Sequence, residues 1–208
     1  RDDSRIYEFS AVRGDDGRAL TPGKNKVRDG LAEIDNFSQG LKFLLGHNIR
    51  KHDLPHLRAA KPDLDLLSWP VIDTLWLNPL AFPRNPYHRL VKHYQDGQLS
   101  RGQLNDPELD ARLTLNVFCD QCEEFRSLAK SNPALLAAWH WLITRDEYGL
   151  ALDKLFTEIR EAPRPSEADA HNIIKDYIAA DCCETAVNDV LGAIDEQPWE
   201  IAYVMAWF

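Results

Sequence analysis

The stretch LLGHNIRKHDLPHL, from Leu44 to Leu57, decides the fold of the N-terminal part of this chain. The apolar run over residues 41–45 predicts a short strand buried on both faces, and it passes through a glycine to His47 and Asn48. Asp53 then precedes Leu-Pro and a new apolar pattern, which predicts a helix over residues 53–60. The strand would therefore present a histidine and an asparagine, followed by a carboxylate at the start of the next helix.

Strands and helices alternate on both sides of this stretch. The β-formers over residues 5–13, followed by the turn GDDGR, predict a hairpin whose return strand lies near Ala19-Leu20. A second buried strand is predicted over residues 71–77. Helices are predicted over 30–39, 87–94 and 105–128, the last with Asp106 as cap and Pro107 in its first turn. This order predicts an α/β fold with a mixed sheet, in which the hairpin is the antiparallel part.

The pattern changes near Asn132-Pro133. The segments from there to residue 208 all show helical periodicity, separated by Gly, Pro or capping residues, and none predicts a strand. We therefore expect an α/β domain over residues 1–130 and an all-helical extension over residues 131–208.

Composition narrows the classes of function. The chain has 208 residues and a net charge of −9, which argues against a general nucleic-acid coat, since such proteins rely on surplus Lys and Arg. Basic residues nevertheless gather over residues 50–61 and 84–101, so local binding of a polyanion is compatible with this charge. No apolar run reaches the roughly 18 residues of a membrane span, and no signal peptide is recognisable. We expect an intracellular, cytoplasmic protein with no membrane partner.

Four cysteines occur as Cys119-x-x-Cys122 and Cys182-Cys183. A CxxC pair can supply half of a zinc site, but two adjacent cysteines are an awkward second half, and both pairs lie in helical sequence. Reduced, partly buried thiols are the favoured interpretation.

Two carboxylates are candidates for metal binding. Asp53 follows the first buried strand, and Asp110 lies in the first turn of the helix predicted over residues 105–128. Sites in open α/β sheets form beyond the carboxyl ends of the strands, and Mg²⁺ prefers oxygen ligands. The alternative is structural: Asp53 could be a helix cap, and Asp110 could complement a helix dipole.

Four blocks resemble one enzyme family. HNIRKHDLPHL is similar to the second signature of the DEDD-type (DnaQ-like, proofreading-subunit) 3′–5′ exonucleases, and NDPELDARLTLNVF is similar to the third. VIDTLWL and RIYEFSAVRG look like two of the family's strands. The resemblance covers roughly residues 1–128. It implies a ribonuclease H-like mixed sheet flanked by helices, and hydrolysis at a nucleic-acid 3′ end by two Mg²⁺ or Mn²⁺ ions, with Asp53 and Asp110 as ligands.

The resemblance also implies roles for other residues and partners. With its helical extension, the chain is most similar to exonuclease domains that precede a RecQ-like helicase. The resemblance therefore implies two partners, a helicase domain on the same chain and a single-stranded DNA 3′ end. It also implies a role in DNA repair. Asn105 occupies the position of the family's general base. The residues expected to contact the substrate are His47, Asn48, Arg50 and His88.

Two departures from the family leave a second hypothesis open. The family's first signature, Asp-x-Glu, would precede Arg5, and Asp2, Asp3 and Glu8 do not fit it. Asn105 cannot take a proton from water at neutral pH, although it could orient one. The alternative is therefore a catalytically inactive module of the same fold that binds nucleic acid or a partner.

Overall fold

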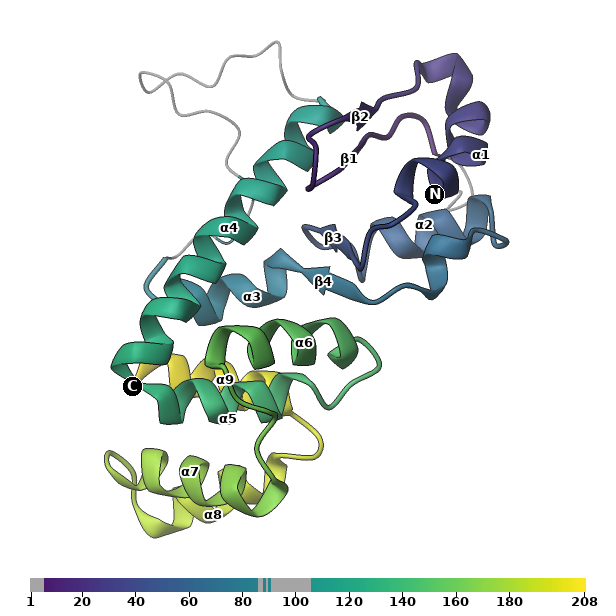
Figure 1. Cartoon of the computed structure of the whole chain (residues 1–208). Coiled ribbons are helices and arrows are strands. Elements are labelled where there is room, and N and C mark those ends of the chain that lie inside the picture. The colour runs from purple at the N-terminus through teal and green to yellow at the C-terminus, as the bar shows by residue number, and fades with distance from the viewer. Residues whose placement is uncertain (1–5, 86–87, 89, 91–105) are drawn as a thin grey trace. The chain divides into compact units, whose positions relative to one another are not determined.

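The computed structural model describes residues 6–85, 88, 90 and 106–208, which form two compact units (Figure 1). One unit contains the described residues up to 75 together with those of 89–118. The other contains those of 76–88 together with 119–208. Most of the helix predicted over residues 87–94, and Asn105, lie outside the described residues.

The predicted hairpin is present in the first unit, but it is short. Strand β1 (Ala11–Val12) pairs antiparallel with β2 (Ala19–Leu20). The prediction of a strand over residues 5–13 was too long, because β2 runs into Thr21-Pro22 and a proline has no N–H for the ladder.

Arg13 ties this hairpin to the following helix. A 3-10 turn η1 (Lys24–Lys26) leads into α1 (Val27–Ser38). The guanidinium of Arg13, which is buried, donates to the carbonyl oxygens of Phe37 and Gln39 at 2.5 and 3.0 Å. These carbonyls belong to the end of α1, where helix oxygens otherwise lack partners.

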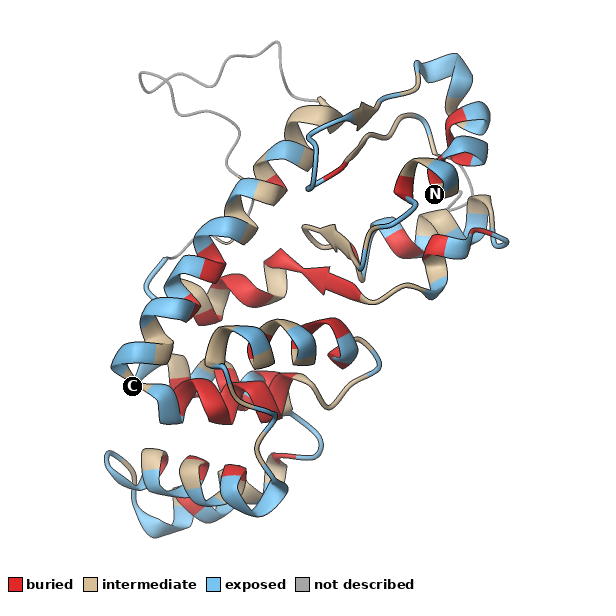
Figure 2. Ribbon diagram, in the orientation of Figure 1, coloured by how far each residue is buried: buried red, intermediate tan, exposed pale blue. Residues whose placement is uncertain are grey.

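A parallel pair of strands lies at the centre of the first unit. Strand β3 (Leu44–Gly46) pairs with β4 (Val71–Asp73), with Gly46 opposite Asp73. Only β4 is buried throughout, as Figure 2 shows, whereas β3 is half-buried, so the prediction that β3 is buried on both faces was wrong. Among the described residues the hairpin and this pair are separate two-stranded sheets, and the expected single mixed sheet is not formed.

The strand predicted over residues 71–77 is also wrong beyond Asp73. Helix α3 (Thr74–Ala81) begins there, because the Asp73 carboxylate accepts the N–H of Leu75 at 3.0 Å and so caps the helix. The apolar run contained a capping residue that the strand interpretation had ignored.

Helix α2 (Asp53–Ala60) has the predicted bounds, and a 3-10 turn η2 (Asp65–Ser68) follows it. The turn from β3 into α2 depends on two residues. Gly46 lies against Ile49, where an added Cβ would come within 2.5 Å of the Ile49 Cβ. Asn48 adopts a left-handed φ of 69°, a conformation that asparagine tolerates better than most residues. The core beside this turn is built around Ile34, Leu64 and Leu66.

The long helix was correctly predicted. Helix α4 (Pro107–Ser131) starts with Asp106, whose carboxylate accepts the N–H groups of Glu108 and Leu109 at 3.1 and 3.0 Å. In the first unit, Phe118 of α4 packs edge-on against Phe43 with ring centroids 5.9 Å apart. Glu108 accepts a hydrogen bond from Thr21, which joins the start of α4 to the hairpin.

The second unit is helical from residue 119 onward, and this part includes residues 131–208, where the sequence predicted helices without a strand. Its central helix α5 (Pro133–Ile143) is apolar on all sides, as expected of a helix enclosed by others, and it contacts α6, α7 and α9. Asn132 caps α5 through a hydrogen bond to the N–H of Leu135. The bounds of the surrounding helices are α6 (Gly149–Arg160), α7 (Glu167–Ala179), α8 (Glu184–Ala193) and α9 (Pro198–Trp207).

A polar network is buried in this helical core. His140 of α5 is 0% exposed, and its Nε2 lies 2.8 Å from a carboxylate oxygen of Asp153. Its Nδ1 lies 2.8 Å from a guanidinium nitrogen of Arg160, which can only donate. Nδ1 is therefore the acceptor and Nε2–H the donor, so His140 is neutral. None of the described helices has the length and apolar character needed to cross a membrane.

Candidate functional site

The candidate site forms where the parallel strands β3 and β4 end. Carboxyl ends of parallel strands meet at one edge of a sheet, and here they bring His47 and Asn48 beside Asp73. Asp73 is 4% exposed and accepts the backbone N–H groups of Asn48 and Arg50 at 2.8 and 3.1 Å, in addition to that of Leu75. A buried carboxylate needs hydrogen-bond donors, and the loop after β3 supplies two of them. Asp73 therefore holds this loop in its conformation.

His47 is oriented from behind by Thr74. The Nδ1 atom of His47 lies 2.9 Å from the hydroxyl oxygen of Thr74, which is fully buried. That hydroxyl donates its one proton to the carbonyl oxygen of Gly46 at 3.3 Å. Nδ1 of His47 is then the donor to Thr74, which leaves Nε2 as the basic nitrogen of the neutral ring.

Asp53 stands at the start of α2 and does not cap it. The N-cap residue is His52, and no side chain caps this helix end. Half of the Asp53 side chain is exposed. Burial of the rest raises the pKa of Asp53; the neighbouring His52 opposes that shift, and the negative charge of Asp73 adds to it. The structural alternative considered for Asp53, a helix cap, is therefore wrong.

Asp110 lies in the first turn of α4, in the same unit as Asp53. Asp106 caps the helix, and Asp110 is one of the acidic residues of its first turn, so the alternative that Asp110 complements the helix dipole stays open. One of its oxygens is buried, and its backbone carbonyl accepts the hydroxyl proton of Thr114 at 2.8 Å. That Asp53 and Asp110 share a cation stays a prediction.

The other predicted site residues have different environments. Arg50 is half-buried and its backbone N–H is bound to Asp73, so it belongs to the same loop as His47. The backbone oxygen of His88, in the second unit, accepts the side-chain amide of Asn78 at 3.1 Å. Asn105, the predicted base position, lies outside the described residues.

Sequence reasoning missed Asp73 and Thr74. The signal was available, because an aspartate followed by threonine at the end of an apolar run is a helix start. The apolar character of the run VIDTLWL predicts a buried strand throughout when this helix-start signal is not considered. The structure places the two residues directly behind the predicted His47 and Asn48.

The donor chemistry at this strand end is carboxylate, imidazole and amide. Asp53 offers oxygen ligands of the kind that Mg²⁺ prefers, whereas both oxygens of Asp73 accept backbone N–H groups. Within the described ranges, no group of three or more His, Cys, Asp or Glu side chains is placed so that it could hold a metal ion. The described residues thus supply a suitable ligand and not a complete cage.

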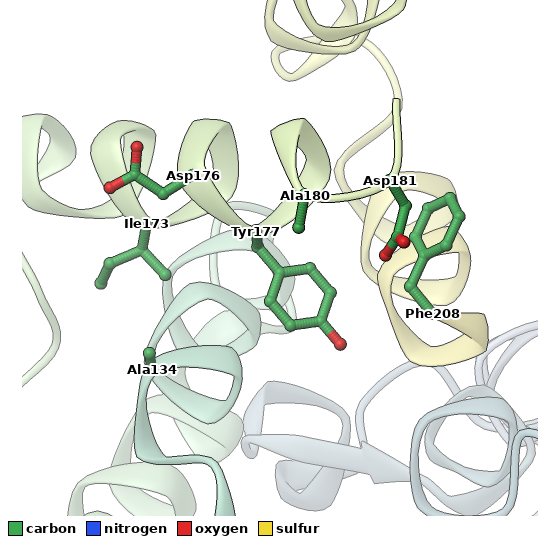
Figure 3. Close-up of a pocket in the computed structure, with 7 residues that line it drawn as sticks. All are labelled: Ala134, Ile173, Asp176, Tyr177, Ala180, Asp181 and Phe208. Atoms are coloured by element: carbon green, nitrogen blue, oxygen red, sulfur yellow. The ribbon is translucent and has the colours of Figure 1, made fainter. Parts of the chain in front are cut away.

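A separate pocket of about 480 Å³ lies in the second unit, between α5, α7 and the end of α9 (Figure 3). Burial raises the pKa of Tyr177 in its wall, and the negative charge of Asp181 acts in the same direction. The wall contains aliphatic and aromatic side chains and two carboxylates. Its lining residues are Ala134, Ile173, Asp176, Tyr177, Ala180, Asp181 and Phe208.

The four cysteines are free thiols. Cys122 is buried in α4, and burial raises its pKa to about 11, so it stays protonated at neutral pH. This agrees with the favoured interpretation of reduced, partly buried thiols.

Comparisons of this chain with protein-family models, with curated proteins and with solved structures found no match.

Proposed function

We propose that this chain carries a metal-dependent 3′–5′ exonuclease domain that hydrolyses phosphodiester bonds at a nucleic-acid 3′ end. One observation carries the proposal. A carboxylate that is half-exposed and caps nothing, Asp53, begins the helix after a strand end that also presents His47 and Asn48. Groups with shifted pKa values that have no structural use concentrate at functional sites. The resemblance to the DEDD-type family supplies the reaction.

The chain's own residues would have the following roles. Asp53 and Asp110 would hold Mg²⁺ or Mn²⁺, together with the Asp-x-Glu pair that the family resemblance places before Arg5. A pair of such ions stabilises the attacking and leaving oxygens of an in-line displacement. Asn48 and Arg50 would bind the phosphate of the terminal nucleotide, beside His47, which Thr74 holds in place. Asn105 would orient the attacking water.

A nuclease assay on 3′-labelled single-stranded DNA, with Mg²⁺ or Mn²⁺, tests this function in the full natural chain. Asp53→Asn and Asp110→Asn should each lower the rate by about 100-fold or more, since each removes charge stabilisation of the transition state. The matched control is Asp120→Asn, an exposed carboxylate ten residues beyond Asp110 on α4, which should leave the rate unchanged.

The second candidate is a catalytically inactive module that binds nucleic acid or a partner domain, such as a helicase on the same chain. Asn105 at the position of the base favours it. No hydrolysis by the full natural chain, together with retained binding of single-stranded DNA, would support this candidate. Equal degradation by the natural chain and by both aspartate variants would contradict the assignment of the site.

A further inference from the structure

We infer that His52 and His56 form a binding site for a transition-metal ion of the Zn²⁺, Ni²⁺ or Cu²⁺ class. The two residues stand four positions apart at the start of α2, a spacing that places side chains on one helix face. Their rings are 4.9 Å apart between centroids, at 67° to each other. Imidazole nitrogen is a preferred ligand of these ions, and this spacing of histidines recurs in zinc sites.

The ring separation suits joint coordination. A metal ion sits about 2.0–2.1 Å from each imidazole nitrogen, which puts it about 3.2 Å from each ring centre. At angles between square and tetrahedral, two such rings have centroids about 4.5–5.2 Å apart. The observed 4.9 Å lies within this range. The two rings therefore already stand at the separation that two imidazoles have on one ion.

Asp53 supplies the second observation. Its carboxylate oxygen lies 3.5 Å from Nδ1 of His52. A metal-bound histidine commonly donates its other ring N–H to a carboxylate, which fixes the tautomer and makes the ligand more basic. With Nδ1–H directed to Asp53, the Nε2 atom of His52 is the metal ligand.

The surroundings permit such a site. The side chain of His52 is 64% exposed, so an ion can enter without unfolding the helix. The protein contributes two imidazoles, and water completes the coordination, as in sites that keep open positions. The site differs from the proposed Mg²⁺ site in ligand type, because nitrogen ligands select Ni²⁺, Cu²⁺ and Zn²⁺ over Mg²⁺.

Calorimetric titration with NiCl₂ in the absence of Mg²⁺ tests the inference on the full chain, because Asp53 is then available to His52. The wild-type protein should show one site whose affinity falls at least tenfold in His52→Ala and equally in His56→Ala. The matched control is the double variant His56→Ala/Arg58→His, which keeps two histidines on α2 but moves one off the shared face. It should bind as weakly as His56→Ala.

Unchanged affinity in both single variants would overturn the inference, and so would full affinity in the double variant. Circular dichroism of each variant establishes that loss of binding is not loss of folding. The readout is binding alone, so the result stands whether or not the domain is a nuclease.

Discussion

Asp73 is the residue on which the geometry of the candidate site depends. Its carboxylate accepts backbone N–H groups from the segments that follow both strands of the pair. These are two N–H groups of the loop after β3 and one in the first turn of α3, which follows β4. Both oxygens are used as acceptors in a buried position. A neutral amide cannot replace this carboxylate, since its NH₂ group would face a donor.

Asp73→Asn should therefore lower the free energy of unfolding by about 1–3 kcal/mol, the usual penalty of an unsatisfied buried polar group. Urea denaturation of the variant measures it. Asp120→Asn serves as the exposed control and should change stability by less than about 0.5 kcal/mol. A loss no larger than that of the control would show that Asp73 does not hold the loop.

His140 predicts a pH dependence of stability. Burial lowers its pKa below the ordinary 6.5, while the hydrogen bond to Asp153 opposes this and the charges of Arg160 and Arg164 add to it. Protonation would also place an N–H against the guanidinium of Arg160. The unfolded chain binds this proton at a higher pH than the folded chain does. The stabilisation of the folded protein by neutral His140 is therefore complete above the ordinary pKa of histidine. It is lost as the pH falls from there towards the lower pKa that His140 has in the folded protein.

Urea denaturation at pH values from 8 to 5 checks this expectation. Wild-type stability should decline below about pH 6.5. His140→Gln should be less stable at pH 8, because it loses the buried network, but its decline over the acidic range should be smaller. Parallel pH profiles for the two proteins would contradict the assignment of a neutral His140.

Side-chain caps define several of the helix starts in this chain. Asp106 satisfies two N–H groups at the start of α4, and Ser166 accepts the N–H of Asp169 at the start of α7. Asp106→Ala should cost about 1 kcal/mol in unfolding free energy, as loss of a cap does. Hydrogen exchange should become faster at Glu108 and Leu109, with no change within α7. Unchanged exchange at these two amides would show that another group caps α4.

The sequence predicted helices better than strands, for a physical reason. Helix α4 carries two local signals, a periodic apolar face and the capping residue Asp106, and α2 carries an acidic first residue and a new apolar pattern, so their bounds follow from neighbouring residues. Strand length depends on a partner elsewhere in the chain: β1 begins only at Ala11, opposite Leu20, because Pro22 stops its partner β2, and β4 ends where Asp73 caps α3. Whether the hairpin and the parallel pair of strands join into one sheet is likewise set by packing that sequence periodicity does not describe.

The candidate site was predicted in part for the same reason. His47, Asn48 and Asp53 follow a strand in the sequence, and the parallel pairing of β3 with β4 places the first two at its carboxyl end. Asp73 and Thr74 act on these residues from 25 and 27 positions away, through contacts that only the folded strand pair creates. Because Asp73 and Thr74 lie far from His47 and Asn48 in the sequence, local sequence patterns do not predict these contacts.

At the scale of the whole molecule, two units with separate cores predict separate responses to mutation. Leu136 is fully buried in α5, at the centre of the second unit. Leu136→Ala should lower the free energy of unfolding of that unit by about 2–5 kcal/mol, because the smaller side chain leaves a cavity. Native-state hydrogen exchange should show faster opening in α5, α6 and α7, with protection of β4 unchanged. An equal loss of protection in β4 would show that the chain unfolds as one cooperative body.

The buried thiol of Cys122 also has a practical consequence. With a pKa of about 11, it stays almost wholly uncharged at pH 7, whereas Cys119 and Cys183 are exposed. Thiolate-seeking dyes should therefore attach to the exposed pair and spare Cys122 until the protein is denatured. Fluorophores could be placed at two positions of the second unit, one on Cys119 of α4 and one on Cys183 before α8, without prior removal of the interior cysteine.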